Sequence, residues 1–273
     1  MSGMLTLVGT PIGNLSDLSP RAVEALQSCD LIAAEDTRVT LKLLNHFGIK
    51  KPLVSYYEHN KHERGGELIA HLEAGEHVVL VSDAGMPAIS DPGEDLVRLC
   101  REQEIPVGCV PGPSAVITAL AMSGMPAKRF TFEGFLSTVK KERKEHLASL
   151  ADEPRTMIFY EAPHKLKDTL ADLSAALGDR PLALCRELTK IHEEVIVTTI
   201  AAACKRYEEE DPRGEFVLIV GGAPKAEKAA ASLADAIALA RSYMDDGDSQ
   251  TVAAKRAAHD TGLKKSDIYK ALS

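Results

Sequence analysis

The sequence predicts an α/β protein with two α/β domains and a small helical, helix-turn-helix-like extension at its C-terminal end. Three observations lead to this prediction. The chain has 273 residues, which is more than one small domain needs. Short apolar runs alternate with helical patterns, as in mostly parallel sheets that are covered by helices on both faces. The final segment is rich in alanine and helical in pattern. We expect domains at 1–123 and 124–224, and the extension at 225–273.

The first half of the chain alternates between strand-like and helix-like segments. Ser19 can cap the first helix and Pro20 suits its first position, because the missing N–H is not needed there. Gly48 can end the second helix in the left-handed conformation. Strands are expected at 4–8, 31–35, 52–56, 77–81 and 106–110, and helices at 18–30, 37–49, 63–76, 94–103 and 114–124.

A linker over 124–132 leads into a second α/β half, whose pattern also allows antiparallel pairing. Strands are expected at 130–135, 156–160, 181–188, 194–200 and 215–222, and helices at 141–151, 164–177 and 200–210. The basic run 140–146 overlaps the first half of the helix at 141–151, and it suits either an exposed helix face with ion pairs or an RNA contact.

The extension contains the spacing of a helix-turn-helix. Ala258, Gly262 and Ile268 supply a small residue at the helix crossing, a turn glycine and an apolar anchor in the second helix. Lys264 and Lys265 stand beside that second helix. Two interpretations stay open here: a helical cap with a solvated charged face, and a nucleic-acid contact.

Composition excludes several classes of protein. The five cysteines show no CxxC spacing, so we expect neither disulfides nor a zinc site. Free cysteines suit a reducing compartment, so we expect a cytoplasmic location. The sequence has no apolar run of about 18 residues and no basic start followed by a long apolar core, so we expect no membrane span and no signal peptide. The net charge of −8 argues against a protein coated in nucleic acid, although a local basic patch is compatible with it.

Polar segments marked by Gly or Pro follow five of the predicted strands. They are 8–14, 81–93, 111–115, 159–165 and 185–194. Such loops gather at the carboxyl edge of an open sheet, where α/β proteins bind ligands, and clefts between domains are favoured sites. The first segment matches neither the dinucleotide nor the P-loop fingerprint. A surface turn is the default interpretation of each segment taken alone, but together the segments predict a cleft enzyme with an adenosine-like or cationic ligand.

The segment 81–93, "VSDAGMPAISDPG", is acidic and has no Lys or Arg. Its carboxylates would repel phosphate and accept hydrogen bonds from hydroxyl and ammonium groups. Asp83 and Asp91 can also cap turns, which is the commoner use of Asp in loops. His164 and His192 lack a second His at ligand spacing, so we expect no metal.

The segments "LVGTPIGNLSDLSPRAVEAL", "IAAEDTR", "VSDAGMPAISDPG", "VPGPSAVITALAMSG", "FYEAPHK", "CRELTKIHEE" and "GEFVLIVGG" occur in this order. Together they resemble the tetrapyrrole methylase superfamily and, within it, the ribosomal RNA small subunit methyltransferase I group. The resemblance covers about residues 4–222. It implies two α/β domains with S-adenosylmethionine (SAM) in the cleft between them, and a homodimer. It also implies methyl transfer to the 2′-oxygen of a cytidine ribose in 16S ribosomal RNA near the decoding centre, with the assembled small subunit as the expected partner.

The resemblance also implies which residues meet the cofactor. They are Pro11, Asp83, Ala84, Gly85, Ala88, Ser114, Ala115, Glu161, Leu188 and Glu215. Tetrapyrrole-modifying members carry a GGDP-like stretch where this chain has "SDAGMP", which leaves the hydrogen bonds of Asp83 open.

The sulfonium methyl of SAM is already electrophilic, so the protein has to align the reacting atoms and exclude water. A ribose hydroxyl gains from a general base, and Glu161, Glu187, His192 and Glu193 are candidates. We favour Glu187 and His192 as catalytic residues, and expect Arg186 or Lys190, together with Lys264 and Lys265, to bind RNA.

Two alternatives remain at this point. The first is a methyltransferase of the same fold that acts on a tetrapyrrole or a protein residue, against which the basic tail and "ELTKIHE" count. The second is a non-catalytic factor for ribosome assembly that binds SAM.

Overall fold

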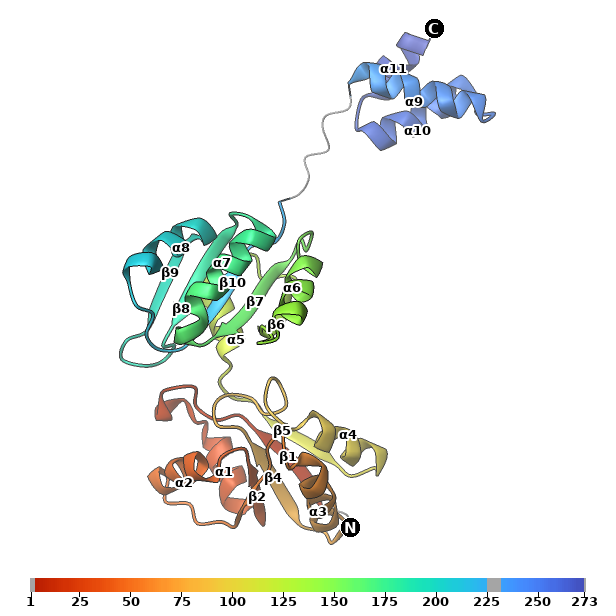
Figure 1. The fold of residues 1–273 in the computed structure, drawn as a ribbon. Coiled ribbons are helices and arrows are strands. Elements are labelled where there is room, and N and C mark those ends of the chain that lie inside the picture. Colours follow the sequence, from red (N-terminus) through yellow and green to blue (C-terminus); the bar gives the residue numbers. More distant parts are fainter. Residues whose placement is uncertain (1–2, 225–231, 273) are drawn as a thin grey trace. The chain divides into compact units, whose positions relative to one another are not determined.

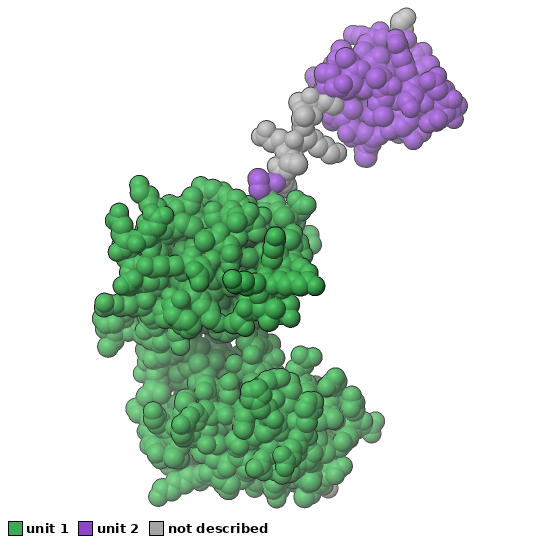
Figure 2. Space-filling view, viewed as in Figure 1, with its two compact units in different colours: residues 1–223 green, residues 224–273 purple. Residues whose placement is uncertain are grey.

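The computed structural model describes residues 3–224 and 232–272. The chain divides into two compact units, Met1–Ala223 and Pro224–Ser273 (Figure 2). Within the described ranges, no helix is long and apolar enough to cross a membrane.

The first sheet of unit 1 is parallel, with strand order β3-β2-β4-β1-β5 (Figure 1). Its strands are β1 (Met4–Val8), β2 (Leu31–Ala34), β3 (Leu53–Ser55), β4 (His77–Val81) and β5 (Val107–Val110). Its helices are α1 (Pro20–Ser28), α2 (Thr37–His46), α3 (Lys61–Glu73) and α4 (Glu94–Glu102), with a short 3-10 turn η1 (Leu15–Asp17). Ser19 caps α1 through its side chain, and Gly48 has a φ of 67°, so the predicted start of the first helix and the left-handed glycine are confirmed.

Helices pack on both faces of this sheet, which explains why its strands are mostly apolar. Along β4, Val79 and Val81 pack into a cluster with α1 and α2, whereas Val78 and Leu80 pack into a second cluster with α3 and α4. Alternate residues of a strand point to opposite faces, so each face needs its own apolar set.

The second sheet is mixed, with order β6-β7-β10-β8-β9. Its strands are β6 (Phe130–Phe135), β7 (Thr156–Glu161), β8 (Pro181–Arg186), β9 (Glu194–Thr199) and β10 (Phe216–Val220). The pair β6–β7 is parallel, and the pairs β7–β10, β10–β8 and β8–β9 are antiparallel, in line with the antiparallel pairing allowed for this half.

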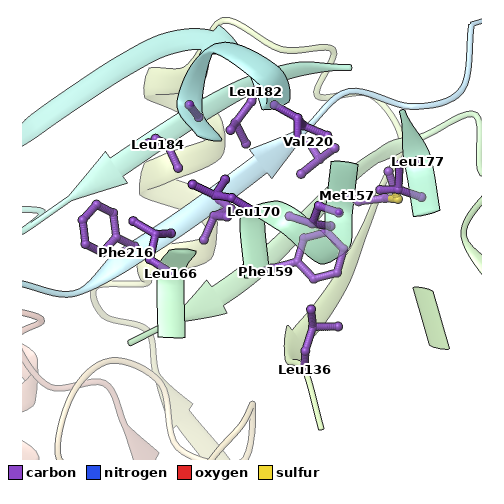
Figure 3. Packing of buried hydrophobic residues seen from close by; sticks show 14 of the residues in the cluster. Leu136, Met157, Phe159, Leu166, Leu170, Leu177, Leu182, Leu184, Phe216 and Val220 are labelled. Atoms are coloured by element: carbon purple, nitrogen blue, oxygen red, sulfur yellow. The ribbon is translucent and has the colours of Figure 1, made fainter. Parts of the chain in front are cut away.

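Three helices cover one face of the second sheet: α6 (Lys140–Ser149), α7 (Leu166–Leu177) and α8 (Ile200–Glu209). Figure 3 shows Met157 and Phe159 of β7 among the leucines of α7 in this cluster. The 3-10 turn η2 (Pro163–Lys165) joins β7 to α7.

The other face of the second sheet is covered by α5 (Ala115–Ser123), which follows β5 of the first sheet in the chain. Val116, Ala119 and Leu120 of α5 pack with Ile158 and Ile219 of the second sheet. The helix therefore links the two halves, although we assigned it to the first domain. The domain boundaries at 123/124 and 224/225 stay predictions.

Unit 2 contains α9 (Leu233–Asp245), α10 (Gln250–Thr261) and α11 (Lys265–Leu272). Gly262 ends α10 in the left-handed conformation, and its N–H donates to the carbonyl of Ala258 at 2.9 Å. Ile268 is fully buried in a core that otherwise consists mainly of alanines. The predicted helix-turn-helix is thus confirmed, while residues 225–231 of the predicted extension lie outside the described residues.

Candidate functional site

A cavity of about 920 Å³ opens in unit 1, at the upper end of the range of small-molecule sites. Its walls are the loops after β4 and β5, the first turn of α5, and parts of β6, β7, β8 and β10. The loops lie at the carboxyl ends of parallel strands, where ligands bind in open sheets.

The cavity brings together most of the predicted site residues. Those that line it are Asp83, Ala84, Gly85, Ser114, Ala115, Glu161, Leu188, Lys190 and Glu215. Pro11, Ala88, Arg186, Glu187 and His192 do not line it, and Lys264 and Lys265 belong to unit 2. The roles assigned to all of these residues stay predictions.

The loop after β1 and the loop after β4 are joined by a small antiparallel bridge. The N–H of Thr10 donates to the carbonyl of Gly85 at 2.9 Å, and the N–H of Gly85 donates back at 3.1 Å. The Thr10 hydroxyl also donates to the carbonyl of Ser82 at 3.1 Å. Gly85 has a φ of 85°, which favours glycine, so the sequence of this loop suits its conformation.

The loop after β1 also touches the loop after β5 through two glycines. A Cβ on Gly112 would lie 2.8 Å from the Cα and carbonyl oxygen of Gly9. Because both contacts are to backbone, a side chain at Gly112 would force the loops apart. Ser114 follows as N-cap of α5 without a side-chain capping bond, so its hydroxyl can serve a ligand instead.

Asp83 lines the cavity and also holds a neighbouring loop. One oxygen of its carboxylate accepts the backbone N–H of Asp36 at 3.0 Å, which ties the loop after β4 to the loop after β2. These strands are neighbours in the sheet, so the contact closes their shared edge. Asp83 therefore links two loops at the edge of the sheet, and its contact with the cofactor stays a prediction.

Three carboxyl groups gather on this wall of the cavity: Glu35, Asp83 and Asp91. Burial raises the pKa of Glu35, and the charges of Asp91 and Asp83 raise it further. Burial is also the main cause that raises the pKa of Asp83 and that of Asp91. A cationic ligand would relieve this repulsion. Sequence reasoning did not assign Glu35, although its place directly after β2 could have indicated it.

Glu161 ends β7 and is only 4% exposed. Its carboxylate accepts the N–H of Ala162 at 2.8 Å and the hydroxyl of Thr169. Arg143 donates to the same hydroxyl at 2.8 Å and pairs with Asp172 at 2.5 Å. Arg143 belongs to the basic run 140–146. Because it bonds to Thr169 and Asp172 of α7, this cation links α6 to α7 and stabilises the fold.

The loop between β8 and β9 carries the predicted catalytic residues. The Glu187 carboxylate accepts from Lys190 Nζ and from the N–H of Glu215, both at 2.9 Å. These hydrogen bonds, first of all the one from Lys190, lower the pKa of Glu187 and make it a weaker base. The same Lys190 Nζ reaches Glu215 at 2.9 Å, and Arg186 pairs with Glu194 at 3.2 Å. The contacts of Glu187 weigh against it as a general base. The carboxylates beside Lys190 and Arg186 partly neutralise the charge of these two cations.

One wall of the cavity is aromatic, and the sequence did not predict it. Phe130, Phe132 and Phe135 of β6 and Tyr160 of β7 line the cavity. The run "FTFEGF" indicated only a strand, because alternation alone does not say which face meets a ligand. His164 also lines the cavity, and the described residues contain no group of three or more His, Cys, Asp or Glu that could hold a metal ion.

The family model of tetrapyrrole (corrin/porphyrin) methylases matches residues 4–204, which include both sheets except β10. The chain belongs to the tetrapyrrole methylase family. It is therefore a methyltransferase, and its cavity lies where the strand ends of this fold converge.

Curated relatives match over nearly the full length. A protein of Synechocystis sp. named Ribosomal RNA small subunit methyltransferase I is 49% identical over 268 residues, covering 98% of this chain and 96% of that protein. A Bacillus subtilis protein of the same name is 44% identical, covering 98% and 94% of the two chains.

Solved structures of tetrapyrrole methylases share the fold. The uroporphyrin-III C-methyltransferase of Thermus thermophilus superposes with a TM-score of 0.57 at 21% identity, over 80% of this chain and 94% of that chain. A diphthine synthase reaches a TM-score of 0.60 at 14% identity, over 80% and 90% of the two chains. The same fold thus occurs in solved proteins with different names.

Proposed function

We propose that the protein transfers the methyl group of SAM to the 2′-oxygen of a cytidine ribose in 16S ribosomal RNA, near the decoding centre. The proposal includes the assembled small subunit as substrate, a homodimer and a cytoplasmic location. The observation that carries it is the 49% identity, over 98% of this chain, to a ribosomal RNA small subunit methyltransferase I. The diphthine synthase and tetrapyrrole enzymes share only the fold, at 21% identity or less.

The cavity has the chemistry that SAM requires. Asp83 and its neighbouring carboxylates can accept hydrogen bonds from ribose hydroxyls and the ammonium group, and they attract a sulfonium. The hydroxyl of Ser114 and the backbone of Ala84, Gly85 and Ala115 offer further polar contacts at the same wall. When bound, SAM supplies an electrophilic methyl group.

The residues of this chain then have three tasks. The glycine contact of Gly9 with Gly112 fixes two loops, so that the nucleophile and the methyl group can be held in line. The apolar lining excludes water. A carboxylate with a raised pKa, such as Glu35 or Asp91, is a stronger base than an ordinary carboxylate and is therefore better suited to accept the hydroxyl proton. Glu187 and His192 remain the bases predicted from the sequence.

SAM binding is expected to weaken as the pH falls through the raised pKa values of the three carboxyl groups. Their protonation removes the negative charge that attracts the cation, so affinity should drop by about tenfold, or ~1.4 kcal/mol. Because each pKa is raised, the loss should begin at a higher pH than for ordinary carboxyl groups. Calorimetric titration at several pH values checks this. Asp83→Asn with Asp91→Asn should bind weakly at neutral pH with a flatter profile, whereas the exposed Asp211→Asn should match wild type.

Unit 2 is proposed to hold RNA phosphate through Lys264 and Lys265. Both are exposed at the start of α11, where positive charge opposes the helix dipole, so these charges do not stabilise the helix through its dipole. Replacing both with Gln should lower the slope of log affinity against log salt by about 2. Filter binding of small subunits at several salt concentrations measures the slope. Replacing both with Arg should preserve it, and an unchanged slope in the Gln variant would show that these lysines do not contact RNA.

The proposed function is tested with labelled SAM, isolated small subunits and naked 16S RNA. Label in the RNA of intact subunits, with little in naked RNA, is the expected result. SAM binding without transfer to either substrate would instead support a non-catalytic factor. Label in a protein of the subunit, with none in its RNA, would overturn the assignment to RNA.

A further inference from the structure

Strand β6 contains an irregularity on the wall of the cavity. Its parallel register with β7 shifts between Phe132 and Gly134, and Gly134 has a φ of 65°. Glycine accepts this left-handed conformation readily, so the sequence permits a bulge at this position.

The bulge changes which face the following residues occupy. Side chains alternate between the two faces of a regular strand, so Phe135 would lie opposite Phe132. With one extra residue, Phe130, Phe132 and Phe135 all line the cavity, while Leu136 is buried in the core under α6 and α7. Bulges often redirect a side chain next to active sites.

Phe135 differs from the other rings of this wall in its exposure. Phe130, Phe132 and Tyr160 pack against the cluster around α5. Phe135 is 61% exposed, and its ring centroid lies 5.4 Å from that of Tyr160. Tyr160 therefore supports the Phe135 ring from one side. Much of the surface of Phe135 remains free to contact a ligand.

The strand order separates this ring from two of the three SAM-assigned residues in this half of the chain, whereas the third, Glu161, ends the neighbouring strand β7. Phe135 is on the edge strand β6, whereas Leu188 follows β8 and Glu215 precedes β10, which both lie beyond β7. A second planar group can therefore bind at the β6 edge of the cavity. Other parts of the cavity lining are apolar and exposed as well, at Ile89 and Ile117.

We propose that Phe135, supported by Tyr160, is the stacking platform for the base of the nucleotide that receives the methyl group. This inference rests on the proposed function. A ribose oxygen can reach the methyl group only if its nucleotide enters the cavity, so its base leaves its stack and needs a new partner. An aromatic face provides that partner, because bases stack on aromatic side chains in proteins that bind single strands.

The experiment compares Phe135→Ala, Phe135→Leu and Phe135→Tyr with wild type in methyl transfer to isolated small subunits. The KM for subunits should rise about tenfold to a hundredfold in Phe135→Ala. It should rise nearly as much in Phe135→Leu, which keeps apolar area without a π face, and stay near wild type in Phe135→Tyr. The SAM Kd of the free enzyme, measured by calorimetry, should not change.

Val197→Ala is the matched control, because Val197 is 67% exposed on the other edge strand of the same sheet and does not line the cavity. It should leave the KM unchanged. An unchanged KM in Phe135→Ala would overturn the platform alone. A weaker SAM Kd would show that the ring binds the cofactor, and a changed sedimentation profile would show a subunit interface; either result overturns the platform. If wild type labels no RNA in the subunit, the proposed function fails and the platform fails with it.

Discussion

Gly112→Ala is expected to lower methyl transfer about 100-fold, because it displaces two loops that position the ligands. The added Cβ would lie 2.8 Å from backbone atoms of Gly9, and backbone cannot rotate away as a flexible side chain can. Overpacking of this kind costs about 1–3 kcal/mol of folding stability. Most of the loss of activity should remain at temperatures where the variant is fully folded. Single-turnover transfer from labelled SAM and thermal melts measure the two effects separately.

Gly66→Ala is the matched control. Gly66 lies in α3, and apart from its chain neighbours and the backbone of its own helix no described atom is within 4 Å of its Cβ position, so alanine fits without displacement. It should raise stability by about 0.5–1 kcal/mol, since alanine favours helix, and leave transfer unchanged. If Gly112→Ala is as stable and as active as wild type, the two loops are not held in place by their glycine contact.

Glu161→Ala is expected to lower both stability and SAM affinity. The carboxylate is buried, accepts hydrogen bonds from Ala162 and Thr169, and also lines the cavity. Its removal leaves buried donors without this acceptor, which costs about 1–3 kcal/mol. Loss of the proposed contact with SAM should weaken binding by at least about tenfold. Denaturant unfolding and calorimetric titration give the two values.

Glu153→Ala separates the two effects, because Glu153 is also a paired carboxylate but does not line the cavity. It accepts from the Arg155 side chain at 2.7 Å and from the Arg155 N–H at 2.8 Å. This variant should lose stability and keep the SAM affinity of wild type. If Glu161→Ala behaves in the same way, Glu161 supports the fold alone and its assignment to the cofactor is wrong.

Local features of the fold could be predicted from the sequence because they depend on neighbouring residues. The cap at Ser19 and the turn at Gly262 follow from capping chemistry and backbone preference. The packing of α5 on the second sheet could not be predicted, because apolar positions do not say which sheet a helix covers. The bulge in β6 was not predicted either, because one extra residue in an apolar strand leaves the strand pattern of the sequence unchanged.

The site was predicted in part. The acidic loop after β4 could be placed at the cavity because strand ends meet at one edge, and Asp83 does line it. Its bond to the N–H of Asp36 joins residues 47 positions apart, and sequence spacing carries no sign of it. Glu187 was predicted as a base from its charge and placement, but its carboxylate bonds to Lys190 in a loop with left-handed backbone at Glu187 and Thr189, which the sequence did not indicate.

The central claim is that the methyl group reaches a ribose oxygen of the small-subunit RNA. It is tested most directly by alkaline digestion of subunit RNA after reaction with methyl-labelled SAM, because alkaline cleavage needs a free 2′-hydroxyl. The account predicts label in an alkali-resistant dinucleotide whose 5′ nucleoside is cytidine. Label in a mononucleotide would place the methyl group on a base and contradict the account.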